Sequence, residues 1–153
     1  MSEITIYTDG AARGNPGRGG YGAILMWGTL RKELSQGYKH TTNNRMELMG
    51  VIVALEAMKK DGQDITIYTD SQYLVNSIEK GWLWNWVKTG FKDKKNKDLW
   101  TRFYKLMQKH QLKFVWVKGH ADNPFNNRCD QLATAAADGG NLQEDVGFGK
   151  DDL

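Results

Sequence analysis

The sequence predicts an α/β fold in which helices cover the faces of one mixed sheet. Two observations lead to this prediction. The segments EITIYTDG at 3–10 and DITIYTDS at 64–71 are nearly identical, and both alternate Ile with Thr or Tyr as β-strands do. The chain between and beyond them reads as short strands interspersed with helical stretches, an order typical of sheets flanked by helices.

The expected elements follow from apolar spacing and turn residues. Strands at 21–27 and 29–38 flank Gly28, which indicates a hairpin. Residues 44–60 are rich in Met, Leu, Val and Ile, as in a helix buried against a sheet, and Asp61-Gly62 ends it. The remaining elements are expected in this order: a strand at 64–70, a helix at 71–80, a further helix, a loop at 89–96, a helix at 97–110, a strand at 113–117, a loop at 118–125 and a helix at 126–138.

Two segments have no such periodicity. Residues 10–20 are rich in Gly and are expected to form a loop. Residues 139–153 combine Gly with scattered acidic residues, and we expect a flexible C-terminal tail there. The predicted domain therefore covers residues 1–138.

Composition restricts the class of protein. The chain has 153 residues, enough for one domain with its own core, and its 40% hydrophobic and 25% charged residues are ordinary for a globular protein. It has no apolar run of the ~18 residues that a membrane span needs, and its N-terminus lacks the pattern of a signal peptide. Cys129 is the single cysteine, so an internal disulfide is excluded. These features predict a cytoplasmic protein without membrane association.

The charge is unevenly distributed. The net charge is +3, but residues 79–118 contain eleven Lys or Arg and three acidic residues, together with five of the six Trp. A basic, aromatic segment in an otherwise acidic chain is typical of a surface that binds a polyanion. The alternative is a solvated, lysine-rich pair of helices whose Trp side chains belong to the core.

Two aspartates follow the repeated strands. If the two strands are parallel neighbours, they lie ~4.8 Å apart, and Asp9 and Asp70 meet at the carboxyl edge of the sheet, where α/β sheets bind ligands. Two such close carboxylates repel each other unless a hard divalent cation lies between them. Alternatively, Asp70 caps the helix that follows it and Asp9 is a turn residue.

Three further residues are candidates for the same site. Glu47 lies in the first turn of the helix at 44–60, where a capping box with Asn44 is the alternative role. Asp130 lies in the last helix, where acids are usually exposed, and His120 lies in a loop, where it is able to move a proton. Four convergent carboxylates suit two metal ions that activate a water and stabilise the leaving oxygen of a phosphodiester.

Two polar segments are candidates for binding a nucleic-acid backbone. The Gly-rich segment 14–20 lacks the Gly-Lys-Ser/Thr ending of a nucleotide-binding P-loop, but it allows a close approach of backbone to a strand. The run Thr41-Thr42-Asn43-Asn44 precedes a helix, a position that suits a phosphate and equally suits ordinary capping.

Taken together, these residues resemble the ribonuclease H type 1 family. The matching stretches occur in the family's order, span residues 4–137 and read TDGAARGNPGRGGYGA (8–23), TTNNRMELMGVIVALEAM (41–58), TDSQYL (69–74) and WVKGHADNPFNNRCDQLA (116–133). The resemblance implies a five-stranded mixed sheet flanked by helices. It also implies a Mg²⁺-dependent endonuclease, with Mn²⁺ as an alternative ion, that hydrolyses the RNA strand of RNA–DNA hybrids and leaves 5′-phosphate and 3′-hydroxyl ends.

The resemblance also implies roles for individual residues. The four metal-binding carboxylates would be Asp9, Glu47, Asp70 and Asp130, and His120 would assist turnover. Asn15, Asn43, Asn44 and Gln72 would contact the hybrid in its minor groove, and Thr42, with Asn15, would hold a DNA phosphate. The region at about 81–98 looks like the basic protrusion of the bacterial enzymes, and its expected substrate-binding residues are Trp82, Trp86, Lys88, Lys94, Lys95 and Lys97.

Two other functions stay open at this point. A catalytically silent binder of hybrids or duplexes needs only the basic, Trp-rich segment, although all four acidic positions are filled here. A different phosphodiesterase on the same fold, such as a DNA-strand transferase or a junction nuclease, is the second alternative. For the ribonuclease we expect a monomer.

Overall fold

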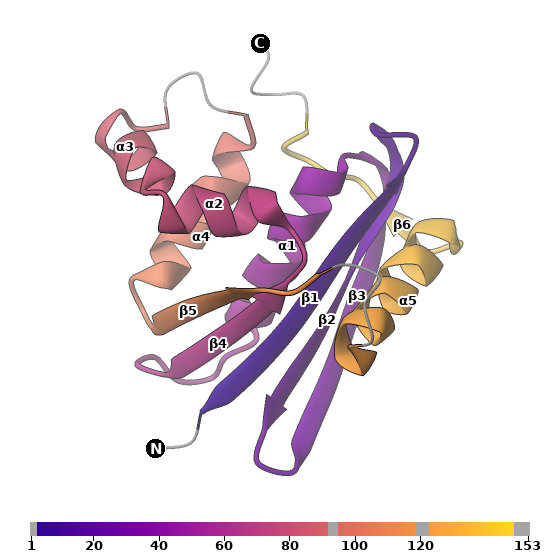
Figure 1. Ribbon diagram of the computed structural model, residues 1–153. Helices are drawn as coiled ribbons and strands as arrows, with labels where there is room; N and C mark the ends of the chain where they lie inside the picture. Colours follow the sequence, from indigo (N-terminus) through magenta and orange to yellow (C-terminus); the bar gives the residue numbers. More distant parts are fainter. Residues whose placement is uncertain (1–2, 92–94, 119–122, 149–153) are drawn as a thin grey trace.

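A computed structural model of the chain describes residues 3–91, 95–118 and 123–148. It forms one sheet and five helices (Figure 1). The strands are β1 (Ile4–Arg13), β2 (Gly17–Trp27), β3 (Leu30–Thr41), β4 (Asp64–Thr69), β5 (Gln111–Trp116) and β6 (Leu142–Gln143). The helices are α1 (Asn43–Glu56), α2 (Gln72–Glu79), α3 (Trp82–Lys88), α4 (Lys97–Met107) and α5 (Pro124–Asp138).

The sheet is mixed, as predicted. Its strand order is β5-β4-β1-β2-β3-β6. Strand β2 pairs antiparallel with both β1 and β3, and β4 pairs parallel with both β1 and β5. The two repeated segments are therefore parallel neighbours, and their register places Thr8 opposite Thr69. Asp9 and Asp70, one residue further along each strand, consequently reach the same level at the carboxyl edge of the sheet.

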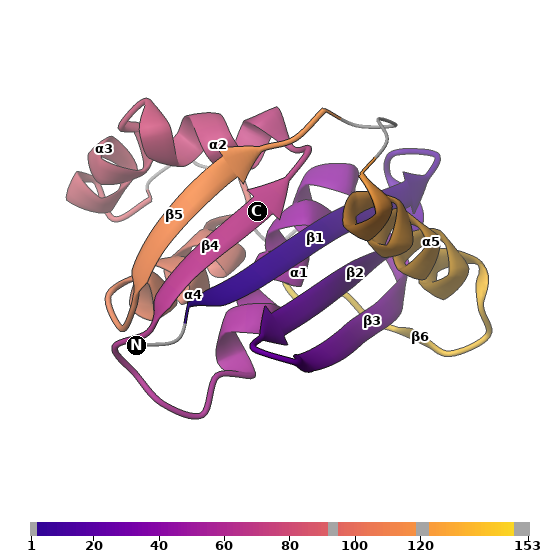
Figure 2. The same cartoon turned by 60° about the horizontal axis from the view of Figure 1, so that its bottom comes forward.

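Helices cover both faces of the sheet. Figure 2 shows α5 on one side and α1 and α4 on the other. The main core lies between the sheet and α1, where Ile6, Ile67 and Phe114 are in register on three adjacent strands and are buried. Trp100 and Phe103 of α4 complete this core. In the described part of the chain, no helix is long and apolar enough to cross a membrane.

On the other face of the sheet, glycine allows α5 to pack directly against the backbone of the strands. A Cβ atom at Gly22 of β2 would lie 2.4 Å from the carbonyl oxygen of Cys129 in α5. Only a residue without a side chain permits this approach, because real Cβ atoms do not come so close to backbone. The glycine therefore brings α5, and with it Asp130, close to the strands that carry the site.

The C-terminal segment differs from the prediction. Instead of a flexible tail from residue 139, Leu142–Gln143 adds a sixth strand, β6, parallel to β3, so the sheet has six strands rather than five. Asp145 follows it and accepts a hydrogen bond from Thr41 Oγ1 over 2.6 Å. Residues 139–148 are thus held in place by contacts with the rest of the domain, and these contacts cannot be predicted from the local sequence.

Two boundaries also differ. Residues 10–13 and 17–20, expected as loop, continue β1 and β2, which leaves only Gly14–Pro16 as the turn between them. Helix α1 ends at Glu56 rather than at residue 60: Ala57 and Met58 still pack against the core, whereas Lys59 and Lys60 are exposed. Neither difference moves the carboxyl edge of the sheet.

Candidate active site

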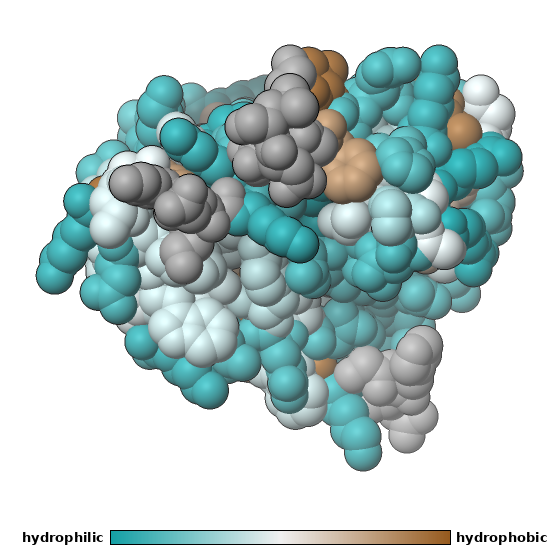
Figure 3. Space-filling view, turned by 90° about the horizontal axis from the view of Figure 1, so that it is seen from above, coloured by the Kyte–Doolittle hydropathy of each residue, from teal (hydrophilic) through white to brown (hydrophobic). Residues whose placement is uncertain are grey.

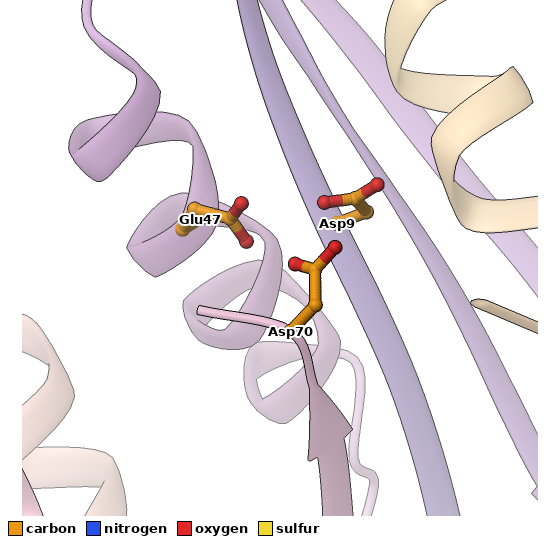
Figure 4. A group of neighbouring side chains, drawn as sticks. All are labelled: Asp9, Glu47 and Asp70. Carbon is orange, nitrogen blue, oxygen red and sulfur yellow. The ribbon is translucent and has the colours of Figure 1, made fainter. Parts of the chain in front are cut away.

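Three carboxylates meet at the carboxyl edge of the sheet (Figure 4). Asp9 comes from β1, Glu47 from α1 and Asp70 from the residue after β4. One oxygen of each lies within 4.8 Å of the others. The prediction that these three distant acids converge is therefore confirmed by the geometry.

Local structure fixes each of the three side chains. Asp9 Oδ1 accepts a hydrogen bond from the Gly10 backbone N–H over 2.9 Å. A Cβ atom at Gly10 would lie 2.5 Å from the backbone nitrogen of Glu47, so glycine lets α1 approach β1 closely enough to put Glu47 beside Asp9. Trp116 Nε1 donates to the carbonyl oxygen of Asp70 over 3.2 Å, which ties that residue to β5.

The alternative capping roles do not apply. Ser71, not Asp70, is the N-cap of α2, and its hydroxyl accepts a hydrogen bond from Leu74 N–H. Thr42 is the N-cap of α1, which places Glu47 beyond the first turn, where it is buried. Both acids are therefore available for other chemistry.

Asp130 lies on the wall of the same pocket. The pocket has a volume of about 460 Å³ and is lined by all four predicted acids. The half-buried Asp130 is not part of the tight group of three, but its charge contributes to the raised pKa of Asp9. The structure thus groups three carboxylates tightly and adds the fourth at the side of α5.

The protein environment opposes ionisation of this cluster. Burial and the neighbouring charge of Asp70 raise the pKa of Asp9 to about 8. Burial, together with the charges of Asp9 and Asp70, raises the pKa of Glu47 well above its ordinary value. A cluster that is costly to ionise in the protein alone is typical of a functional site.

The donor set fits a hard divalent cation. All three clustered residues offer carboxylate oxygens, the ligands that Mg²⁺ and Mn²⁺ prefer. Among the described residues, Glu47 Oε2 is one of few buried side-chain oxygens without a hydrogen-bond partner. A cation between these groups would satisfy that oxygen and offset the repulsion that raises the two pKa values.

Comparison with known proteins identifies the family and the fold. The sequence model of the family described as RNase H matches residues 1–138. The chain belongs to the RNase H family. A protein of Desulforamulus reducens named Ribonuclease H is 55% identical over 151 residues, 95% of this chain and 94% of that protein. One of Synechocystis named Ribonuclease HI is 50% identical over 155 residues, 97% and 96% of the two chains.

Solved structures of this family share the fold. The crystal structure of LC9-RNase H1, described as a type 1 RNase H with the type 2 active-site motif, has a TM-score of 0.81 at 28% identity, covering 90% of this chain and 72% of that one. LC11-RNase H1, solved in complex with an RNA/DNA hybrid, has a TM-score of 0.67 at 27% identity, covering 88% of this chain and 96% of that one.

The predicted polar residues lie around this RNase H pocket. Asn43, Asn44 and Gln72 line it. Asn15 stands beside them, because its Oδ1 accepts a hydrogen bond from Asn43 N–H over 3.1 Å. Thr42 caps the helix at the same place, so all five predicted minor-groove and phosphate residues are grouped at the N-termini of α1 and α2.

The basic segment 79–118 contains α3, α4 and β5. Trp82 is exposed, with the Lys80 ammonium 5.6 Å from its ring centroid, whereas Trp86 packs against Trp100 at 5.4 Å. Lys88 and Lys95 are exposed. Figure 3, which looks onto the end of the molecule that carries α3, shows a mostly hydrophilic surface with hydrophobic residues in small separate spots.

Some predicted residues stay untested by the structure. His120 and Lys94 lie outside the described residues. Conversely, the pocket is also lined by Arg13, Tyr73 and Thr134, which sequence reasoning did not select. Arg13 shares the strand face of Asp9 at a spacing of four residues, but this signal is lost when residues 10–20 are interpreted as a loop.

Proposed function

We propose that the chain is an endonuclease that hydrolyses the RNA strand of RNA–DNA hybrids, with divalent metal ions held by Asp9, Glu47, Asp70 and Asp130. The single observation that carries this proposal is the convergence of the first three carboxylates within 4.8 Å. Membership of the RNase H family and the relatives named Ribonuclease H support it. The hybrid bound to LC11-RNase H1 supports the choice of substrate.

The four carboxylates would hold the metal ions and balance their positive charge. Asp9, Glu47 and Asp70 would supply the shared oxygens, and Asp130 would complete the site from α5. Bound Mg²⁺, with Mn²⁺ as the alternative, would supply Lewis-acid activation of a water and would stabilise the leaving 3′-oxygen, so that the products carry 5′-phosphate and 3′-hydroxyl ends.

The polar rim provides strand discrimination. A hybrid carries 2′-hydroxyls on one strand only, and its minor groove is open to short polar side chains. Asn43, Asn44 and Gln72 line the pocket and offer both donors and acceptors, so they suit contacts to 2′-hydroxyls and base edges. Asn15 is held beside them by its hydrogen bond to Asn43.

Two further sites would hold the backbone. Thr42, with Asn15, stands at the N-terminus of the 14-residue helix α1, where backbone N–H groups and the helix dipole favour a phosphate. Trp82, Trp86, Lys88, Lys94, Lys95 and Lys97 would grip the DNA strand at the protrusion through charge and stacking. His120 would assist release of the product.

Cleavage of a labelled hybrid with and without Mg²⁺ tests this function. We expect Asp70→Asn to abolish cleavage while the fold is kept. Asp64→Asn is the matched control, because it removes an acid from the opposite end of the same strand and is expected to cleave at the wild-type rate. Robust cleavage by Asp70→Asn would remove the proposed mechanism.

The substrate class and the alternatives are separated by the same assay. We expect cleavage of the hybrid and none of duplex DNA or duplex RNA. Binding of the hybrid without cleavage at any Mg²⁺ concentration identifies a silent binder, and equal cutting of duplex DNA identifies a different phosphodiesterase.

We also propose that the protein is a monomer in the cytoplasm, in keeping with its one buried cysteine, Cys129. Light scattering after gel filtration tests the first statement, and a mass of twice 17.4 kDa contradicts it. Cell fractionation tests the second, since recovery with membranes contradicts it.

A further inference from the structure

Two arginines face each other at the tip of the β1–β2 hairpin. Arg13, the last residue of β1, is directly opposite Arg18 of β2 in the strand register. Side chains that are opposite in an antiparallel pair lie on the same face of the sheet, so the two positive charges are neighbours. Figure 1 shows this hairpin tip and α3 on opposite sides of the carboxyl end of β4.

Arg13 also belongs to the acidic pocket. Among the described residues that line this pocket, it is the one Lys or Arg, beside four carboxylates. Because side chains alternate along a strand, Asp9 and Arg13 point to the same face of β1, roughly 13 Å apart at the usual rise per residue. A nucleic acid whose scissile phosphate lies at Asp9 therefore carries its backbone past Arg13 within a few nucleotides.

Without a bound substrate, both arginines form interactions that are weak and exposed to solvent. Arg13 donates to the Asp138 carboxylate through Nε (2.9 Å) and Nη2 (2.7 Å), and the two side chains are 54% and 55% exposed. Arg18 Nη2 donates to the carbonyl oxygen of Gly139 over 2.7 Å. Exposed ion pairs contribute little to stability, so a phosphate is able to replace the carboxylate at little cost.

We infer that Arg13, supported by Arg18, binds a backbone phosphate of the hybrid on the side of the pocket opposite to the basic protrusion. This inference rests on the proposed function. It gives the enzyme two positive surfaces, one on each side of four acids that repel the backbone. Asp138 then competes with the substrate for Arg13 and holds the guanidinium in a bidentate geometry that also suits phosphate.

A purely structural role for Arg13 makes the opposite prediction. The arginine lies at the negative end of α5, where a cation stabilises the helix through its dipole and its ion pair with Asp138. If that were its whole contribution, removing either member of the pair would have the same effect. If Arg13 binds phosphate, removing Asp138 frees the arginine for the substrate.

Binding of a labelled RNA–DNA hybrid in EDTA, measured by fluorescence anisotropy over a series of salt concentrations, distinguishes these roles without cleavage. We expect Arg13→Gln to raise the Kd about three- to tenfold and to reduce the slope of log K against log salt by about one. Asp138→Asn is expected to leave the Kd unchanged or to lower it. Arg31→Gln removes another exposed arginine, one that is ion-paired with Glu33 and does not line the pocket, and is the control for net charge.

The results separate this inference from the proposed function. An unchanged Kd for Arg13→Gln overturns the inference, and so does a rise for Asp138→Asn of more than twofold, because Arg13 then acts only through its pair. The proposed function fails on a different observation, the absence of Mg²⁺-dependent hybrid cleavage by the wild-type protein.

Discussion

The guanidinium of Arg45 donates through Nε to Oδ2 of Asp145 over 2.6 Å, although the two residues are 100 positions apart. Both side chains are 1% exposed. Arg45 also donates to both oxygens of Asp98, at 2.8 and 2.7 Å, so that one side chain joins α1, α4 and the segment after β6. Burial lowers the pKa of the Arg45 guanidinium, but the hydrogen bonds that it donates to Asp98 and Asp145 outweigh this effect and raise it.

This buried pair predicts a large loss of stability when it is broken. In Asp145→Asn, Arg45 keeps Asp98 but loses half of its compensating charge in the core. Removing one partner of a buried ion pair costs about 3 kcal/mol or more, and we expect a loss of about 3 kcal/mol here. Urea unfolding followed by circular dichroism measures the change.

A matched control is available on the same two helices. Arg102 of α4 and Glu56 of α1 also form an ion pair, at 2.8 Å, but their side chains are largely exposed. We expect Glu56→Gln to change the free energy of unfolding by less than about 1 kcal/mol. Equal losses in the two variants would contradict the importance of burial.

The approach of α1 to β1 at Gly10 predicts a joint loss of activity and stability. Alanine there places a Cβ atom 2.5 Å from the Glu47 nitrogen, so the helix must move away from the strand and Glu47 moves away from Asp9. We expect Gly10→Ala to lose about 1–3 kcal/mol of stability, and to lose hybrid cleavage at temperatures where it is still folded.

Gly140→Ala serves as its control. A Cβ atom at Gly140 meets nothing within 4 Å, and its backbone is not in the left-handed region. Wild-type cleavage and stability are expected there. Full cleavage by Gly10→Ala would show that the spacing of α1 and β1 does not set the geometry of the carboxylates.

The sequence predicts the centre of this site because each of the two strands that carry its aspartates is recognisable from its own residues. The repeated Ile-Thr-Ile-Tyr-Thr pattern identifies two strands, and their parallel pairing alone brings Asp9 and Asp70 together. The role of Glu47 is harder to predict from the sequence, because an acidic residue near the start of a helix is also explained by capping. Its burial, which decides the matter, depends on the close contact of α1 with Gly10.

The C-terminal segment was missed because its stabilisation is not local. Two residues of strand and a run of Gly and acids have no periodicity. What holds the segment is the pairing of β6 with β3 and the ion pair of Asp145 with Arg45, both of which depend on residues some 100 positions earlier. The same reason explains Arg13, whose partners Asp138 and the pocket become visible only in the fold.

The raised pKa of Asp9 predicts how stability depends on pH without metal. Its ordinary pKa is 3.8 and its value in the folded protein is about 8. Between these values the unfolded chain is ionised while the folded protein still holds the proton. The free energy of unfolding therefore falls as pH rises from about 4 to about 8, by up to about 1.4 kcal/mol per unit for one group, and it levels off above.

Urea unfolding in EDTA across this pH range measures that slope. We expect Asp9→Asn, which has no proton to lose, to show a smaller fall and to exceed the wild type in stability at pH 8. Mg²⁺ is expected to raise the melting temperature of the wild type more than that of Asp9→Asn, because the ion compensates the carboxylates. A wild-type stability that rises between pH 4 and 8 contradicts the cause assigned to the shift.

The basic protrusion predicts an effect on substrate affinity rather than on chemistry. Lys95 and Lys97 lie at the start of α4, away from the carboxylate pocket. Neutralising them together with Lys94 removes phosphate contacts, so we expect KM to rise several-fold, kcat to change less, and the salt dependence of binding to weaken. Neutralising Lys59 and Lys60, exposed residues beyond the C-terminal end of α1, controls for total charge and is expected to leave KM near the wild-type value. An unchanged KM with a collapsed kcat would show that the protrusion acts on the reaction itself, although neither Lys95 nor Lys97 lines the pocket of Asp9 and Asp70.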